Sequence, residues 1–323
     1  MHWLEPVKRM DRPLLSPEHI KNTAVARLPT ALLLLLLNLV PQVLLAAEIS
    51  VTDDLGNTVV LDQPAQRIVS LSPHITESLY AAGAGEKIVA TVQFSDYPEE
   101  AAQIPVIGSY REIAYEAIVA MDPDLVIVWA SGNGEEIIAR LRSLGFTVYL
   151  DEPRSIEGIA ESLRNFGKLA GSSDIAEPRA DALLVRLNSL RKSDAGTVPV
   201  RVFYEVWNDP LTSLNGEHLI SDIIRLCGGE NIFAAAIPLA PVVSTESVLA
   251  ADPQIIVVSG MDEQRPEWLD EWRQWPGLSA AETDQLRFIP PDLLQRNSPR
   301  IIQGAEQMCE FIERARAAIS GNP

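Results

Sequence analysis

The sequence predicts an α/β protein with two Rossmann-like lobes, each with a mostly parallel sheet, joined by a long interdomain helix. Three observations support this fold class. Short apolar runs typical of buried strands alternate with helical patterns, which indicates parallel sheets with helical crossovers. Two strand-rich parts are separated by residues 155–192, which have no strand pattern. Finally, a thirteen-residue segment of the first part recurs in the second.

The first lobe is assigned to residues 48–171. It opens with a hairpin around the turn Asp53-Asp-Leu-Gly-Asn57, because two short apolar runs flank a glycine-containing turn. The helical patterns that follow end at Gly83 and Gly145, the usual type of helix stop. The predicted strands are 49–51, 58–61, 67–71, 87–92, 125–129 and 147–150.

The connecting helix is assigned to residues 172–196 and the second lobe to 197–323. The helical pattern begins at Glu177, with Pro178 in the first turn, where proline is tolerated. Its apolar face is formed by Leu183, Leu184, Leu187 and Leu190. Strands of the second lobe are predicted at 200–206, 254–258 and 286–289.

Residues 116–128 and 246–258 are identical at five of thirteen positions. Each segment reads as a helix that ends at Asp-Pro and leads into a buried strand. Asp-Pro alone is a common helix stop, so a chance match is the alternative. The length of the match favours duplication, and we therefore expect two similar lobes that face each other across a cleft.

Residues 1–47 have the composition of a secretory signal peptide. Basic residues precede an apolar run at 31–37, and Ala46 and Ala47 precede Glu48. A membrane anchor is the alternative, but the run is shorter than ~20 residues. No cysteine stands at the cleavage point, which argues against a lipoprotein, and Met10 is a second candidate start. We expect an exported, periplasmic protein.

The charge balance excludes several kinds of partner. The chain has 26 Lys+Arg against 44 Asp+Glu, and a net charge of −18 disfavours nucleic acid and anionic membrane surfaces. The sequence has only four histidines, which disfavours a metal site with several histidine ligands. Cys227 and Cys309 are the only cysteines, so export predicts one disulfide. Two buried free thiols are the alternative.

In proteins with open parallel sheets, ligands bind beyond the carboxyl ends of the strands. The residues there are aromatic and neutral-polar, which suits a large, flat, partly apolar ligand edged with amides or hydroxyls. They suit phosphate, sulfate or a bare metal ion poorly. We place four aromatic residues in the cleft and assign five others to packing. The cleft set is Phe94, Tyr110, Trp129 and Trp207; the packing set is Tyr97, Tyr204, Trp268, Trp272 and Trp275.

No catalytic or metal-ligating set is predicted. Ser72, His74 and Asp96 could be imagined as a triad, but no nucleophile-elbow pattern supports it. His74 is expected to be a polar wall residue, with direct metal ligation as the less favoured alternative.

Several motifs together resemble the helix-hinged (class III) periplasmic substrate-binding proteins of ABC-type importers, which carry cobalamin, siderophores or haem. Within that family, the motifs are similar to those of the cobalamin-binding members. They are Arg67-Ile-Val-Ser-Leu-Ser-Pro-His-Ile-Thr-Glu77, Ser95-Asp-Tyr-Pro98, Asp124-Leu-Val-Ile-Val-Trp129, Leu226-Cys-Gly-Gly-Glu-Asn-Ile-Phe233 and Arg296-Asn-Ser-Pro-Arg300. The cysteine pair also matches the disulfide of those members.

The resemblance implies ligand contacts from both lobes. Where a cobalamin-binding member has a further tryptophan, this chain has Leu239-Ala-Pro241. A weaker clamp, and with it a different corrinoid or weaker binding, is therefore possible. The implied contacts are Phe94, Tyr110, Trp129, Trp207, Asp292, Leu293, Leu294, Gln295 and Arg296.

Glu116 and Glu246 occupy equivalent places in the repeat. Such a pair suits a two-fold partner with paired basic pockets. The resemblance likewise implies docking on arginines of a dimeric permease with ATPase subunits.

We expect a monomeric, non-enzymatic carrier without a cofactor, whose transported ligand is a corrinoid, most simply cobalamin. The alternatives are a haem- or ferric-siderophore-binding protein of the same fold and an exported α/β hydrolase.

Overall fold

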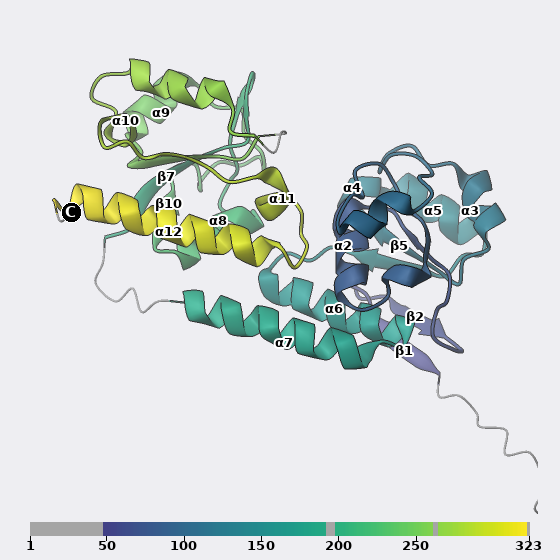
Figure 1. Ribbon diagram of the computed structural model, residues 1–323. Helices are drawn as coiled ribbons and strands as arrows, with labels where there is room; N and C mark the ends of the chain where they lie inside the picture. The colour runs from purple at the N-terminus through teal and green to yellow at the C-terminus, as the bar shows by residue number, and fades with distance from the viewer. Residues whose placement is uncertain (1–47, 192–197, 261–263, 322–323) are drawn as a thin grey trace, which may run out of the picture. The chain divides into compact units, whose positions relative to one another are not determined.

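The computed structural model describes residues 48–191, 198–260 and 264–321 (Figure 1). The predicted signal peptide, 1–47, lies outside the described residues, as does the end of the predicted connecting segment, 192–196. In the described part of the chain, none of the helices combines the length and apolar character needed to cross a bilayer.

The first lobe contains a four-stranded parallel sheet and a separate antiparallel hairpin. The hairpin pairs β1 (Ile49–Thr52) with β2 (Thr58–Leu61), and Asp53 closes its turn by accepting hydrogen bonds from the Leu55 and Asn57 backbone. The sheet order is β4 (Ile88–Ala90), β3 (Ile68–Ser70), β5 (Leu125–Trp129) and β6 (Val148–Asp151). The sheet is covered on both faces, which explains the continuous apolar runs of these strands.

Helices connect these strands where the sequence pattern predicted them. These helices are α2 (Pro73–Ala81), α3 (Tyr115–Met121), α4 (Ala130–Asn133) and α5 (Glu135–Ser143), together with the 3₁₀ turns η2 (Gly85–Lys87) and η3 (Glu99–Gln103). Gly145 follows α5 with a positive φ of 86°, a conformation in which a side chain would be strained.

The second lobe has a parallel sheet in the order β10 (Gly229–Asn231), β7 (Val200–Glu205), β11 (Ile255–Val258) and β12 (Leu286–Phe288). A small ribbon pairs β8 (Trp207–Asn208) with β9 (Leu211–Thr212). The helical elements are α8 (Leu219–Leu226), α9 (Thr245–Ala251), the 3₁₀ segment η4 (Glu267–Gln274), α10 (Ser279–Glu282), α11 (Pro291–Leu294) and α12 (Ile301–Ile319).

The two sheets share one topology, which confirms the repeat seen in the sequence. In each, the first strand in sequence lies between the second and the third, and the fourth forms the far edge. The repeated segments coincide with α3–β5 and α9–β11. Each repeated helix ends on a left-handed aspartate, Asp122 at φ 45° and Asp252 at φ 41°. Arg67 and Arg201 each donate hydrogen bonds to the last carbonyls of these helices.

The connection between the lobes contains two helices. α6 (Ile156–Ala170) packs along α7 (Ser173–Leu190), and Arg164 of α6 pairs with Glu177 and Asp181 of α7. The prediction that the long helix begins at Glu177 was wrong, because it begins at Ser173. Pro178 therefore lies inside the helix, where it removes one backbone hydrogen bond.

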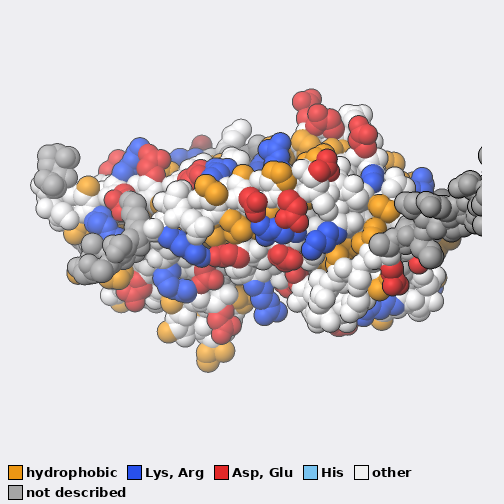
Figure 2. Space-filling model, turned by 90° about the horizontal axis from the view of Figure 1, so that it is seen from below, with side chains coloured by type: hydrophobic (Ala, Val, Ile, Leu, Met, Phe, Trp, Pro, Cys, Tyr) orange, Lys and Arg blue, Asp and Glu red, His pale blue; other side chains and the backbone are white. Residues whose placement is uncertain are grey.

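The face that carries α7 shows basic and acidic side chains interspersed (Figure 2). Several of them form ion pairs: Arg186 with Glu306 of α12, and Arg191 with Glu157 of α6. The paired charges tie the long helix to α12 of the second lobe and the residue at its end to α6.

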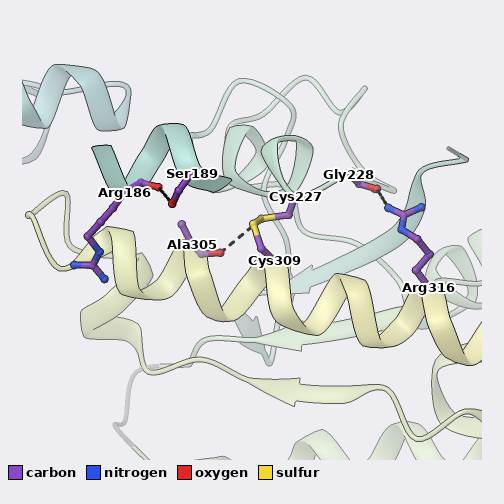
Figure 3. Close-up of a disulfide and its surroundings, with 7 residues drawn as sticks. All are labelled: Arg186, Ser189, Cys227, Gly228, Ala305, Cys309 and Arg316. Carbon is purple, nitrogen blue, oxygen red and sulfur yellow. Dashed lines mark hydrogen bonds between the residues drawn. A yellow bond between two sulfur atoms is a disulfide. The ribbon is translucent and has the colours of Figure 1, made fainter. Parts of the chain in front are cut away.

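The predicted disulfide is confirmed. Cys227, at the end of α8, is bonded to Cys309 in the middle of α12 (Figure 3). Arg316 of α12 donates a hydrogen bond to the Gly228 carbonyl at 2.8 Å, so the same turn is held twice. In the described residues there is no free cysteine.

Two expectations for aromatic packing were wrong. Trp268, Trp272 and Trp275 lie on or next to the 3₁₀ segment η4 rather than an α-helix, and Trp275 is exposed. Tyr97 is also exposed, at 44%. Tyr204 and Trp272 are buried, as predicted.

Candidate ligand-binding site

Trp129 and Tyr110 form a neighbouring aromatic pair at the carboxyl end of β5. Their ring centroids lie 5.9 Å apart with a tilt of 42°. Buried Asn133 fixes both segments, because its side chain accepts a hydrogen bond from the Trp129 backbone N–H and donates to the Tyr110 and Leu71 carbonyls. The pair is therefore presented by a rigid support.

A buried polar chain lies next to Trp129. His74 Nδ1 is 2.7 Å from Ser72 Oγ, and His74 Nε2 is 3.1 Å from Asp151 Oδ2. Asp151 also accepts a hydrogen bond from Ser162. The imidazole meets the Trp129 ring edge-on, with centroids 5.4 Å apart. His74 is thus a support for the aromatic residue, held by hydrogen bonds on both ring nitrogens.

The carboxylate that pairs with His74 is Asp151 and not Asp96, so the structure does not assemble the triad that the sequence analysis had set aside. Ser72 is 1% exposed, whereas a nucleophile must reach its substrate. Among the described residues, no group of three or more His, Cys, Asp or Glu side chains is arranged to hold a metal ion.

Phe94 and Trp207 present large exposed side chains. Phe94 is 74% exposed and has a φ of 66°, a left-handed conformation that is strained for a bulky residue. Trp207 is 37% exposed, and its indole N–H donates to the Asp209 carbonyl at 2.7 Å, which fixes the orientation of the ring. Large exposed apolar side chains that lie together are typical of binding surfaces.

The segment 292–296 divides into core and polar residues. Leu294 is 1% exposed and belongs to the hydrophobic core, and Leu293 packs against the same core. The structure thus places Leu294 beyond the reach of a ligand. Gln295 donates hydrogen bonds to the Ser259 and Gly260 carbonyls, which anchors α11 at the end of β11.

Arg296 and its neighbours form a charge network between the lobes, which we define as Glu77, Asp96, Asp292, Arg296 and Arg300. Arg296 Nη1 lies 2.8 Å from both Glu77 and Asp96, and its Nε lies 3.0 Å from Asp292. Arg300 donates to both oxygens of Glu77, at 2.7 and 2.9 Å.

Glu77, on α2 of the first lobe, is 3% exposed. It also accepts a hydrogen bond of 2.6 Å from Ser298. Burial of Arg296 acts to lower its pKa, but hydrogen bonds to Asp96 and Glu77 and the nearby carboxylates outweigh this, so the pKa is raised. The arginine therefore stays charged.

Glu116 and Glu246 lie at the second residue of α3 and of α9, and both are exposed. Hydrogen bonds to its own backbone N–H and to Ser244 lower the pKa of Glu246. The repeated arginine contacts described above hold the two helices in matching positions, so the acidic pair is a structural repeat as well as a sequence repeat.

A cavity of about 1200 Å³ lies beside α2, α7 and the start of α12. Its walls include Glu77, Tyr97 and Arg300 and the apolar Leu163 and Ile175. The four aromatic residues predicted to bind the ligand are not part of its lining, so this cavity is separate from the aromatic site.

Comparison with known proteins assigns the family. A model of the family described as periplasmic binding protein matches residues 68–293. The chain belongs to the periplasmic binding protein family. The vitamin B12-binding protein of Vibrio cholerae is 37% identical over 254 residues, covering 78% of this chain and 91% of that protein. The vitamin B12-binding protein of Yersinia pestis is 36% identical over 248 residues, covering 77% and 86%.

Solved structures agree with this assignment. The crystal structure of the periplasmic vitamin B12 binding protein BtuF of Vibrio cholerae has a TM-score of 0.72 and 36% identity, covering 78% of this chain and 98% of that one. The periplasmic haem-binding protein RhuT of Roseiflexus has a TM-score of 0.67 and 25% identity, covering 78% and 99%. This periplasmic binding protein thus has two parallel-sheet lobes in a fold shared by carriers of different ligands.

Sequence reasoning missed the residues that support the site of this periplasmic binding protein. Asn133, Asp151 and Glu77 each bond to partners far along the chain. The only local signal was their position. Asn133 follows β5 and Asp151 ends β6, whereas Glu77 lies in a motif that indicated the family but no role for this residue. Tyr97, assigned to the core, instead stacks on Arg300 at 3.8 Å.

Proposed function

We propose that this protein captures a corrinoid, with cobalamin as the main candidate, and delivers it to an ABC importer. The observation that carries the proposal is the close relationship to vitamin B12-binding proteins over nearly their whole length. The aromatic set, with amide and carboxylate groups around it, fits a large ligand whose flat ring is edged with amides.

The proposed ligand contacts come from both lobes. Trp129, Tyr110 and Phe94 supply ring faces from the first lobe, and Trp207 supplies one from the second. Asp292 and Arg296 supply polar contacts at the junction, with Leu293 and Gln295 as supporting residues. Dispersion contact over ring faces supplies affinity, and hydrogen bonds at the ligand edge supply orientation.

Haem binding is the nearest alternative within the fold. It would favour a tyrosine or histidine as axial ligand, and His74 is the imidazole next to the aromatic pair. Both of its ring nitrogens are already hydrogen-bonded and the side chain is buried. His74 therefore gives no support to haem ligation, and corrinoid binding needs no protein ligand to the metal.

Delivery is proposed to use Glu116 and Glu246 as contacts to a dimeric permease that works with ATPase subunits. Both side chains are exposed, and the two helices that carry them repeat in sequence and structure. We further propose that the protein is periplasmic, is exported by residues 1–47, works as a monomer, and has no enzymatic activity or resident cofactor. The boundaries 48–171, 172–196 and 197–323 remain our proposal for the domains.

Ligand identity is tested by calorimetric titration of residues 48–323 with cyanocobalamin, cobinamide, haem and a ferric siderophore. We expect one-to-one binding of a corrinoid, and a Trp129→Ala variant is expected to bind it at least ~tenfold more weakly, because an aromatic contact is lost. Trp275→Ala removes another exposed tryptophan outside the site and is the matched control. Binding of haem or siderophore alone would contradict the proposal.

Docking is tested by corrinoid uptake in cells that carry the importer. The Glu116→Ala/Glu246→Ala double variant is expected to bind ligand normally but to lose uptake. Glu136→Ala/Glu230→Ala also removes one exposed glutamate from each lobe and serves as the control. Normal uptake by the first double variant would contradict the docking role.

A further inference from the structure

We propose that Asp96 determines the charge specificity of the ligand site. Its carboxylate masks the Arg296 guanidinium, so that the site accepts amide-edged ligands and disfavours those that carry carboxylates. The inference rests on the proposed function, since it assumes that ligand binds beside Arg296.

The hydrogen-bonding capacity of Arg296 is largely used within the protein. Its Nη1 is shared between Glu77 and Asp96, each at 2.8 Å, and its Nε is 3.0 Å from Asp292. A guanidinium recognises a carboxylate best through two parallel N–H donors. Because Nε and Nη1 are both engaged, a ligand carboxylate could use two parallel donors only by displacing one of the protein's own acids.

The charge network carries more negative than positive charge. Glu77, Asp96 and Asp292 oppose Arg296 and Arg300. Because the excess charge is acidic, a ligand carboxylate placed beside it is repelled, whereas an uncharged amide can donate to the exposed acid. The network is thus a filter on ligand charge rather than an anion site.

Asp96 is the member of the network that faces solvent. Its side chain is 55% exposed, whereas those of Glu77, Asp292, Arg296 and Arg300 are 2% to 16% exposed. The charge of Asp96 can therefore be removed while the ion pairs of Arg296 and Arg300 with Glu77 and Asp292 remain. A ligand that approaches the network from solvent meets Asp96 first.

The loop that carries Asp96 is held in place beside the aromatic site. Ser95 is buried, and its hydroxyl accepts hydrogen bonds from Thr91 at 2.8 Å and Thr76 at 3.3 Å. Phe94, one residue earlier, is a proposed ligand contact, and Tyr97, one residue later, stacks on Arg300 at 3.8 Å. One rigid segment thus delivers a ring to the ligand, an acid to Arg296 and a ring to Arg300.

The experiment compares two ligands of the same shape and different charge. They are cyanocobalamin and its monocarboxylic acids, in which one side-chain amide is hydrolysed to a carboxylate. Affinities of residues 48–323 are measured calorimetrically for the wild type, Asp96→Asn, Asp96→Glu and Asp62→Asn. Asp62 is exposed, so its variant changes the net charge equally in another part of the first lobe.

We expect the wild type to bind at least one monocarboxylic acid about tenfold more weakly than cyanocobalamin. Asp96→Asn should narrow this ratio to about twofold, because asparagine keeps an oxygen that can accept from a ligand amide but no longer repels a ligand carboxylate. Asp96→Glu and Asp62→Asn should keep the wild-type ratio. A merely structural role of Asp96 would lower both affinities together and leave the ratio unchanged.

Equal binding of cyanocobalamin and every monocarboxylic acid by the wild type would overturn the inference and leave the proposed function standing. An unchanged ratio in Asp96→Asn would also overturn it. Failure of the wild type to bind any corrinoid would instead overturn the proposed function, and the inference with it.

Discussion

Replacing Glu77 by glutamine is expected to weaken the junction between the lobes more than any exposed charge removal. Glu77 is buried on α2 and accepts hydrogen bonds from Arg296, Arg300 and Ser298. Glutamine keeps the volume but removes the charge, and its amide N–H₂ would face arginine N–H donors. Two partly buried guanidiniums would then share Asp292 and Asp96.

Removing one partner of a buried ion pair costs about 3–5 kcal/mol, because the remaining charge is left unpaired. Asp292 still lies 3.3 Å from Arg300, so we expect a value near the lower limit, about 3 kcal/mol. The assay is equilibrium unfolding in guanidinium chloride, followed by tryptophan fluorescence and circular dichroism. Glu86→Gln, at an exposed glutamate of the neighbouring η2, should change the free energy of unfolding by less than about 0.5 kcal/mol.

A loss below about 1 kcal/mol for Glu77→Gln would refute this reasoning, since that is the range of exposed ion pairs. It would mean that the arginines find other partners at no cost. Hydrogen exchange of residues 296–300 gives an independent check, because the segment should exchange faster when its anchor on α2 is lost.

Three further predictions concern stability. Burial raises the pKa of Glu205 to about 8 despite donation from Trp272, so the folded state holds an extra proton between pH 4.5 and 8. Unfolding free energy should fall by up to ~1.4 kcal/mol per pH unit as pH rises through this window, and Glu205→Gln should flatten that slope in pH-dependent denaturation. Reduction of Cys227–Cys309, which closes a separation of 82 residues, should cost roughly 4 kcal/mol in the same assay. Arg201→Gln should lower the free energy of unfolding by about 1 kcal/mol, and with it the melting temperature, because the carbonyls at the end of α9 lose their donor.

Most of the sheet was predictable because its strands are buried on both faces. A strand such as 125–129 must then be continuously apolar, and this is a local signal. The start of α7 was not predictable in the same way, because its first turn packs Ala176 closely against Gly167 of α6, a tertiary contact that local propensity does not reveal. Tertiary contacts also allow Pro178 inside that helix.

The residues of the candidate site could be predicted only where their position at the end of a predicted strand identified them. Trp129 and Trp207 were found because they end or follow strands. The partners of Arg296 were not found, because Glu77 lies 219 residues away in sequence and glutamate is a common residue on helices. The same holds for Asp151 and His74, whose 77-residue separation gave no pattern. Long-range polar pairs leave no periodicity for a sequence reading to detect.

The repeat separates the parts of the molecule that stay alike from the parts that differ. Arg67 and Arg201 cap equivalent helices, and Glu116 and Glu246 keep equivalent positions on them. At the opposite ends of the repeated strands the match is lost: the offset that aligns Glu116 with Glu246 places Ser259 where the first lobe has Trp129. A two-fold partner would act on the first pair equally, whereas an asymmetric ligand touches each lobe differently. The divergence at the strand ends and the retained acids therefore fit the proposed function, in which the protein binds an asymmetric ligand and docks on a two-fold symmetric permease.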